Sequence, residues 1–445
     1  QEKKAPSDGV ITGYGVINGN LVYVYSQDAA VLGGTIGEMH AKKIANLYEK
    51  AMKMGAPVIG LIDCAGLRLQ EATDALEGFG TIYKKMSIAS GVIPQITAVY
   101  GECGGGLAVL AELSDFVFVE EKKAKLFVNS PNALDGNYES KLDTSSAEFM
   151  AKAGVADFIG DEETIANGVR QLVSMLPSNN EEGAVYTDNQ DDLNRVCADM
   201  SAEIADAALA LTDISDDGLF VEVKAEYAKE MVTGFIQLDG VTVGAVANRT
   251  AIYDENGEKA EEFAAVLTTD GAYKAAEFVT FCNAFEIPVL SLTNVKGFEA
   301  NVRAEKTIAK AAAKLVYAFS NADVPKVNVI TGEAYGSAYV AMNSKSVGAD
   351  MVYAWSQASI GMMDASLAAK IMYADENAAA DDVTAKINEK ASEYAALQSS
   401  VEQAAARGYV DTIINPEDTR KYIIAAFEML FDKREVRADK KHGTV

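Results

Sequence analysis

Apolar and polar positions follow two periods along this chain. Short runs rich in β-branched and aromatic residues, such as 21–25 and 241–246, predict β-strands. Longer stretches carry an apolar residue every three or four positions, as in Ile44, Leu47 and Ala51, and predict helices that bury one face. Strands and helices that alternate in this way are typical of a mostly parallel sheet covered by helices. The pattern therefore predicts an α/β fold.

The same order of motifs occurs twice. The strand-like segments that contain Pro57 and Pro288 are 231 positions apart, and so are the Gly-Glu pairs at 101–102 and 332–333. Each copy opens with a pair that predicts a hairpin turn, Asn-Gly at 18–19 and Asp-Gly at 239–240, here 221 positions apart. Three landmarks in the same order indicate an internal duplication.

Length agrees with this division, because 445 residues exceed the size at which one hydrophobic core keeps growing. We expect two domains of one fold, residues 1–215 and 216–445, with the junction in the polar stretch 178–192 or the helix after it.

Charge limits the partners. The chain has 39 basic and 65 acidic side chains and a formal net charge of −26, which argues against nucleic acids and anionic membranes.

Histidine and cysteine are scarce. The histidines are His40 and His442, and the four cysteines lie far apart without a CxxC pair, so neither a metal site nor a disulfide framework is predicted. A reducing compartment fits this cysteine usage. Because no apolar run reaches transmembrane length and residues 1–8 are too polar for a signal peptide, we expect a cytoplasmic protein, associated with a membrane at most through a partner complex.

A glycine-bearing loop follows a predicted strand in each copy, at 99–108 and 330–339. Small residues let a ligand approach the backbone, and the first N–H groups of the next helix are free to donate. Neither loop has the lysine of a phosphate-binding P-loop, so an oxyanion hole for an enolate is the favoured function. The alternative is that the glycines serve tight strand–helix packing alone.

Several segments resemble one known family. They are 281–290, 323–345 and 348–355 in the second copy, and 8–15, 33–38, 68–71, 90–94 and 176–180 in the first. Together they are similar to the carboxyltransferase subunit of biotin-dependent acyl-CoA carboxylases and of the related sodium-pumping acyl-CoA decarboxylases, such as those acting on methylmalonyl-CoA or glutaconyl-CoA. The resemblance implies two tandem crotonase-like domains, with the active site between the N-terminal domain of one protomer and the C-terminal domain of another.

The resemblance also implies roles for residues. Gly105, Gly106 and Leu107 would hold the acyl-CoA thioester oxygen, and Gly336, Ser337 and Ala338 would hold the ureido oxygen of carboxybiotin. The residues implied to bind the cofactors are Cys64, Ala65, Gly66 and Arg68 on the acyl-CoA side and Gly297, Phe298, Tyr335 and Val340 on the biotin side. No metal is implied in this subunit.

The implied partners follow from the same family. They are an acyl-CoA substrate, a separate biotin carrier protein, and either a biotin carboxylase or a membrane decarboxylase subunit. A hexamer, as a trimer of dimers, is implied as well.

Two departures from the family pattern keep alternatives open. The segment 294–301 differs, and Cys64-Ala-Gly-Leu-Arg68 replaces the usual Ser-Gly-Gly-Ala-Arg. The chain is thus either a transferase working in the carboxylating or the decarboxylating direction, or a non-catalytic crotonase-like scaffold. The tetrapeptide Ala51-Met-Lys-Met54 matches a biotin-attachment sequence, but it lies in a predicted helix and is interpreted as a coincidence.

Overall fold

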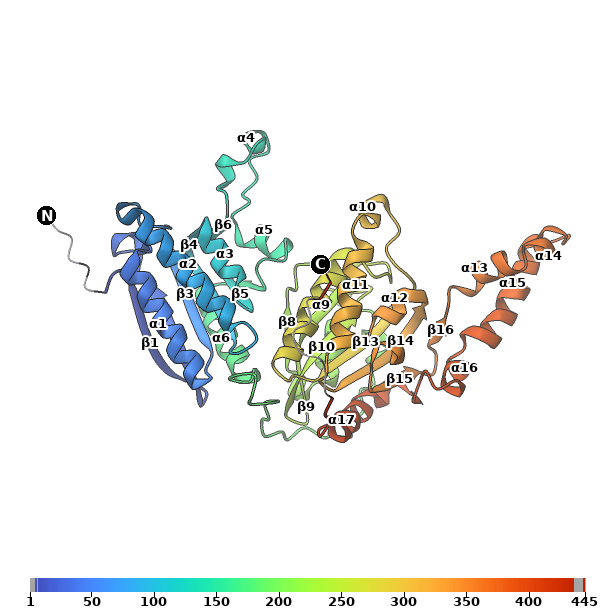
Figure 1. The fold of residues 1–445 in the computed structure, drawn as a ribbon. Helices are drawn as coiled ribbons and strands as arrows, with labels where there is room; N and C mark the ends of the chain where they lie inside the picture. Colours follow the sequence, from blue (N-terminus) through green and yellow to red (C-terminus); the bar gives the residue numbers. More distant parts are fainter. Residues whose placement is uncertain (1–4, 6, 436–442, 445) are drawn as a thin grey trace. The chain divides into compact units, whose positions relative to one another are not determined.

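The structure, a computed structural model, describes residues 5, 7–435 and 443–444 (Figure 1). His442 lies outside the described residues. The chain forms two compact units. The first comprises residues 1–185 with the short segments 223–227 and 284–286, and the second comprises 186–222, 228–283 and 287–445.

The first unit is built on a seven-stranded sheet. Its strands are β1 (Val10–Ile17), β2 (Asn20–Gln27), β3 (Val58–Cys64), β4 (Gln95–Gly104), β5 (Phe116–Glu120), β6 (Lys125–Phe127) and β7 (Phe158–Gly160). Their order is β1-β2-β3-β4-β5-β7, with β6 beside the end of β4. β1 and β2 are antiparallel, and the other pairs are parallel.

Helices connect these parallel strands. They are α1 (Glu38–Met54), α2 (Ala72–Ala89), α3 (Gly106–Glu112), α4 (Asn137–Ser140), α5 (Ala147–Lys152) and α6 (Glu162–Met175). α1 and α2 pack side by side over the sheet (Figure 1). The predicted apolar stripe of α1 is buried at Ile44, Leu47 and Ala51, and the helix ends at Gly55 in a left-handed conformation.

The second unit repeats this architecture in an eight-stranded sheet. Its strands are β8 (Phe220–Val223), β9 (Met231–Leu238), β10 (Val241–Asn248), β13 (Val289–Val295), β14 (Lys326–Tyr335), β15 (Met351–Trp355), β16 (Ser359–Gly361) and β17 (Thr412–Ile414). The order is β17-β15-β14-β13-β10-β9-β8, with β16 beside the end of β14. A separate hairpin joins β11 (Ala251–Tyr253) and β12 (Lys259–Glu262).

The helices of the second unit follow the same plan with additions. They are α7 (Met200–Glu203), α8 (Ala207–Ile214), α9 (Thr269–Ala284), α10 (Val302–Glu305), α11 (Ile308–Asn321), α12 (Gly336–Ala341), α13 (Ala365–Met372), α14 (Ala374–Ala378), α15 (Val383–Tyr394), α16 (Val401–Ala406) and α17 (Thr419–Met429). α13, α14 and α15 extend away from the sheet of this unit (Figure 1).

The two sheets correspond strand by strand. β1 to β5 with β7 in the first unit match β9, β10, β13, β14, β15 and β17 in the second, in the same spatial order. Both opening hairpins turn on residues with positive φ, Asn18 and Gly19 in one and Asp239 and Gly240 in the other, as a type I′ turn requires. The predicted α/β fold and its duplication are therefore confirmed.

The change from the first unit to the second falls between Val185 and Tyr186, inside the polar stretch 178–192 and well before the expected boundary at 215/216. The reason is packing, because α8 buries Ala207, Leu211 and Ile214 in the core of the second unit. Within the described part of the chain, each helix is too short or too polar to cross a bilayer.

Candidate active site

The first glycine loop (residues 101–107) begins where β4 departs from its pairing with β3. The register shifts between Ile62 and Cys64, and the Asp63 carboxylate accepts a hydrogen bond from the Glu102 amide (3.3 Å). A Cβ on Gly101 would collide with Asp63 Oδ1, so a side chain there would displace this carboxylate. The chain thus leaves regular pairing at a defined place and turns toward α3.

The second glycine loop (residues 332–338) repeats this device 231 positions later. The register of β13 and β14 shifts between Thr293 and Val295, and Asn294 Oδ1 accepts a hydrogen bond from the Glu333 amide (3.0 Å). A Cβ on Gly332 would lie 2.7 Å from that oxygen. Asp63 and Asn294 were not among the predicted site residues, although their common spacing of 231 was a signal that could have found them.

Gly105 turns the first loop into α3 with a φ of 63°, and its amide donates to the Phe127 carbonyl (2.8 Å). This amide is used within the fold. Gly106 and Leu107 begin the helix, where N–H groups have no acceptor inside the helix. Of the three predicted donors, the N–H groups of Gly106 and Leu107 are therefore placed to donate to a ligand oxygen, whereas Gly105 shapes the loop.

The second loop turns in the same manner at Gly336, whose φ is 62°. Ser337 is exposed and Ala338 is buried at the start of α12. Tyr335 is buried, and its hydroxyl donates to Ser359 Oγ (2.9 Å), while Val340 is 38% exposed on the helix surface. The structure thus brings Tyr335, Gly336, Ser337, Ala338 and Val340 onto one strand–helix junction.

The loops after β3 and β13 are also equivalent. The Ile36 amide donates to the Gly66 carbonyl (2.9 Å), and the Leu267 amide donates to the Gly297 carbonyl (2.9 Å). The corresponding residues pair in parallel bridges, Ile36 with Leu67 and Leu267 with Phe298. Ala65 and Gly66, and likewise Gly297 and Phe298, therefore lie on matched loops near the carboxyl ends of the two sheets.

Arg68 is buried, and its guanidinium is held within the first unit. It contacts Asp8 (2.5 Å) and Glu71 (2.7 Å) and donates to the Thr35 carbonyl (2.8 Å). These contacts fasten the start of the chain to the loop after β3, so Arg68 has a structural role in this arrangement.

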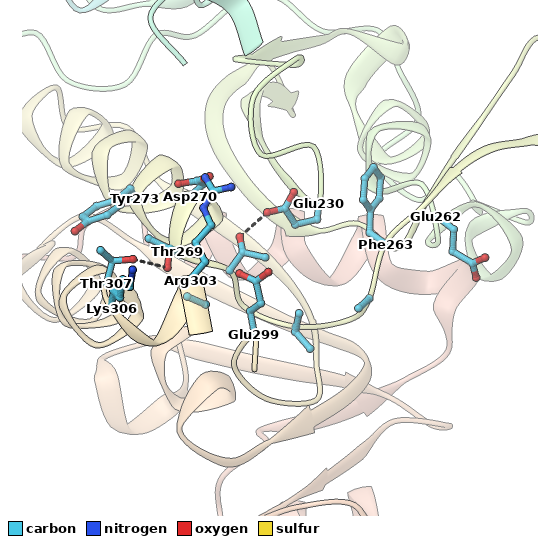
Figure 2. Close-up of a pocket in the computed structure, with 14 residues that line it drawn as sticks. Glu230, Glu262, Phe263, Thr269, Asp270, Tyr273, Glu299, Arg303, Lys306 and Thr307 are labelled. Carbon is cyan, nitrogen blue, oxygen red and sulfur yellow. Dashed lines mark hydrogen bonds between the residues drawn. The ribbon is translucent and has the colours of Figure 1, made fainter. Parts of the chain in front are cut away.

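The position equivalent to Arg68 in the second unit carries Glu299, and here a cavity of about 750 Å³ opens (Figure 2). Glu230, which accepts a hydrogen bond from the Thr268 hydroxyl, lines it together with Glu299 and Arg303. The Glu299 carboxylate accepts a hydrogen bond from Asn301 Nδ2 (2.8 Å). None of the predicted site residues lines this cavity.

Cys64 and Cys103 are register partners on β3 and β4 beside the first glycine loop. Both are fully buried, and burial raises the pKa of the Cys64 thiol to about 11 and that of Cys103 further. Thiols held neutral in this way are poor nucleophiles. The described residues contain no group of three or more His, Cys, Asp and Glu placed to hold a metal ion.

The arrangement suits chemistry in which charge develops on oxygen. Each unit presents a glycine loop whose backbone can approach an anion closely, and a Cβ placed on Gly105 would meet no heavy atom within 4 Å. That open space fits a carbonyl oxygen next to the amides of Gly106 and Leu107.

These features define a class, proteins with two tandem crotonase-like domains. The chain belongs to the family described as the carboxyl transferase domain, whose model matches residues 1–445.

Two relatives are similar to this chain over most of their length. Methylmalonyl-CoA decarboxylase subunit alpha of Propionigenium modestum is 39% identical, and the match covers 99% of this chain and 86% of that protein. The propionyl-CoA carboxylase carboxyltransferase subunit of Haloferax mediterranei is 40% identical, with 100% and 87% covered.

A solved structure of transcarboxylase 12S, described as a hexamer and with methylmalonyl-coenzyme A and methylmalonic acid bound, has a TM-score of 0.91 to this chain. It is 36% identical, and the match covers 99% of this chain and 85% of that one. The predicted family and crotonase-like fold are confirmed, and the chain is a biotin-dependent acyl-CoA carboxyltransferase.

Proposed function

We propose that this chain transfers a carboxyl group between carboxybiotin on a separate carrier protein and the α-carbon of a short acyl-CoA, with propionyl-CoA and methylmalonyl-CoA as the substrate pair. The observation that carries this proposal is the pair of matched glycine loops, one per unit, each turning on a glycine with positive φ. The names of the relatives and the methylmalonyl-coenzyme A bound to transcarboxylase 12S support the acyl group.

The first glycine loop receives the acyl-CoA thioester in this proposal. When the α-carbon loses a proton, negative charge moves onto the thioester oxygen, and the amides of Gly106 and Leu107 donate to it. Fixed backbone donors stabilise such charge without a titrating side chain, and loss of one typically costs a hundredfold or more in rate. Ala65 and Gly66 border the same end of the sheet and remain our predicted contacts to coenzyme A, with Cys64 beneath them.

The second glycine loop receives the ureido oxygen. The residues that orient it are Gly336, Ser337 and Ala338, with Tyr335, Val340, Gly297 and Phe298 as the predicted surroundings. Carboxybiotin, when bound, supplies the carboxyl group. In the carboxylating direction the N–C bond of that group breaks, a C–C bond forms at the acyl α-carbon, and the α-proton ends on the ureido nitrogen.

The direction of transfer has two candidates. Methylmalonyl-CoA decarboxylase alpha subunits of Propionigenium modestum and Veillonella parvula are 39% and 38% identical to this chain, and a carboxylase subunit is 40% identical. The second candidate is therefore the alpha subunit of a sodium-pumping decarboxylase, in which the same loops carry the group from methylmalonyl-CoA to biotin. A biotin carboxylase as partner belongs to the first candidate and a membrane subunit to the second.

The test is decarboxylation of methylmalonyl-CoA by the purified chain with free biotin. The release of CO2 and propionyl-CoA is measured. We expect turnover that depends on biotin and that falls at least about a hundredfold in Gly106→Asp and in Ala338→Asp, since each carboxylate would occupy the place of an anionic oxygen. Binding of acyl-CoA without turnover of methylmalonyl-CoA, malonyl-CoA or glutaconyl-CoA would instead identify a scaffold subunit.

A further inference from the structure

A cluster of polar side chains is buried in the core of the second unit beneath α12. It consists of Ser291 and Thr293 on β13, Asn328 on β14, and Asn343, which follows α12. All four side chains are fully buried. We call these four residues the buried polar cluster.

Hydrogen bonds join the cluster to itself. Asn328 Oδ1 accepts from Ser291 Oγ (3.0 Å) and from Thr293 Oγ1 (2.8 Å). Asn343 Nδ2 donates to Ser291 Oγ (2.9 Å). The two neighbouring strands and the segment after α12 are therefore connected through side chains as well as through the sheet.

The cluster also holds a backbone carbonyl. Asn328 Nδ2 donates to the Met342 carbonyl (3.3 Å), and Thr293 Oγ1 lies 3.3 Å from the same oxygen. Met342 is the first residue after α12, and Asn343 adopts a left-handed φ of 52°. α12 has only six residues. The segment that starts with Gly336 therefore spans a short distance between β14, which holds it at one end, and the buried polar cluster, which holds it at the other.

The first unit folds the same way without such a cluster. The residues 231 positions earlier are Gly60, Ile62, Thr97 and Glu112, of which Gly60 and Ile62 have no side-chain hydrogen-bonding groups and Glu112 is exposed. Thr97 pairs with Ser114 (2.5 Å) in the first unit. The fold therefore does not require the polar residues of the second unit.

Burying these polar groups costs free energy, and the fold alone does not explain why they are there. Polar side chains lose their hydration on burial, and Asn343 Oδ1 has no hydrogen-bond partner among the described residues. What a connected buried network provides is one defined arrangement of the segments that it joins. Here those segments are β13, β14 and the end of α12.

We propose that Thr293 and Asn328 are positioning residues for the second glycine loop: through the Met342 carbonyl they fix α12, and thereby place the Gly336–Ala338 amides for the ureido oxygen of biotin. This inference rests on the proposed function of that loop. It assigns the cluster to the biotin side of the reaction and leaves the acyl-CoA side unaffected.

The experiment uses the full chain and the variants Thr293→Val and Asn328→Leu, which keep similar volume and remove the hydrogen bonds to Met342. With methylmalonyl-CoA and free biotin as substrates, we expect the KM for biotin to rise or kcat to fall about 10-fold to 100-fold, as displaced catalytic groups do. The KM for methylmalonyl-CoA should stay within about twofold of that of the wild-type chain.

Ser215→Ala is the matched control. Ser215 is a fully buried hydroxyl of the same unit, which donates to the Leu219 carbonyl (2.5 Å) and accepts from the Gln237 amide (2.9 Å) near the opposite edge of the sheet. We expect it to lower the melting temperature without changing the KM for biotin. A rise in the KM for methylmalonyl-CoA equal to the rise for biotin in Thr293→Val and Asn328→Leu, or the same loss of activity in Ser215→Ala, would overturn the proposal.

A second readout does not depend on activity. Amide hydrogen exchange of residues 336–343 should be faster in Thr293→Val and Asn328→Leu than in the wild-type chain, and unchanged in Ser215→Ala. Unchanged exchange in that segment overturns the positioning role. Absence of turnover in the wild-type chain refutes the proposed function instead, and faster exchange in the two variants then still supports the hold on α12.

Discussion

Gly106 has no space on its side-chain face. A Cβ there would lie 2.7 Å from the Tyr83 hydroxyl, which donates to the Gly106 carbonyl (2.5 Å). We expect Gly106→Ala to push this segment from its place and to lower kcat about 10-fold to 100-fold. Steady-state kinetics with methylmalonyl-CoA and free biotin measure the effect.

Tyr83→Phe provides the control for this prediction. It removes the hydroxyl that the new methyl group would meet, so Gly106→Ala combined with Tyr83→Phe should recover part of the lost activity. Full activity in Gly106→Ala alone would contradict a role of this segment in catalysis.

His40 is fully buried in α1, although a helix-surface position is the commoner place for a histidine. Its ring lies 3.2 Å from Gln27 Nε2 and 3.1 Å from the Asp8 carbonyl, and burial lowers its pKa to about 4. The unfolded chain, with a histidine pKa near 6.5, therefore binds this proton more readily than the folded protein does. The part of the folding stability that depends on neutral His40 is fully present above pH 6.5 and is lost as the pH falls through 4.

The corresponding test compares the wild-type chain with His40→Gln in denaturant unfolding from pH 7 to pH 4. We expect the wild-type chain to lose roughly 2 to 3 kcal/mol more stability than the variant over this range. The difference between the two chains matters, because Asp115, whose pKa burial raises to about 7, acts in the opposite direction in both. If the free energies of unfolding of the two chains changed in parallel with pH, His40 would not be the group responsible.

At the scale of elements, the bulge at the end of β4 depends on Asp63 and Gly101. We expect Gly101→Ala to destabilise the fold by about 1 to 3 kcal/mol, since the methyl group would displace the Asp63 carboxylate. Thermal unfolding checks this value.

The second unit supplies the control for the bulge, because Asn294 takes the place of Asp63 there. Both side chains accept an amide hydrogen through Oδ1, so Asp63→Asn should leave stability nearly unchanged, whereas Asp63→Ala should cost about 1 kcal/mol. A loss in Asp63→Asn equal to that in Asp63→Ala would show that the charge, and not the hydrogen bond, is what the bulge needs.

Elements were predictable where the local pattern is strong. The hairpins at 18–19 and 239–240, the helix that ends at Gly55 and the strand–loop–helix order of both glycine loops all appear as expected. The use of the Gly105 amide was not predictable, because its acceptor at Phe127 belongs to a strand that pairs with β4 in space.

At the scale of the whole molecule, the resemblance implies an active site that combines loops of two protomers, and the transcarboxylase 12S neighbour is described as a hexamer. If one chain supplies the first glycine loop and another the second, co-assembled Gly106→Asp and Ala338→Asp chains should form some sites with both loops intact. We expect the co-assembled chains to be clearly more active than either variant alone. Assays of co-expressed and separately purified chains check this.

Mixing the two variants after each has been purified separately is the control for that prediction. Subunits then combine only if the oligomers dissociate. An inactive co-expressed mixture, in oligomers shown by mass spectrometry to contain both variants, would place both loops of each site on one chain.

The sequence by itself determined the duplicated α/β fold, the two glycine loops and the family. These depend on local periodicity, on turn chemistry and on a repeat that can be compared position by position. Tertiary structure alone decided which glycine amides are already used, that Arg68 is bound by Asp8 and Glu71, and that polar residues connect β13 and β14 to α12 in the second unit. The physical reason is that a donor's availability depends on the acceptors folded against it, and those acceptors come from distant parts of the chain.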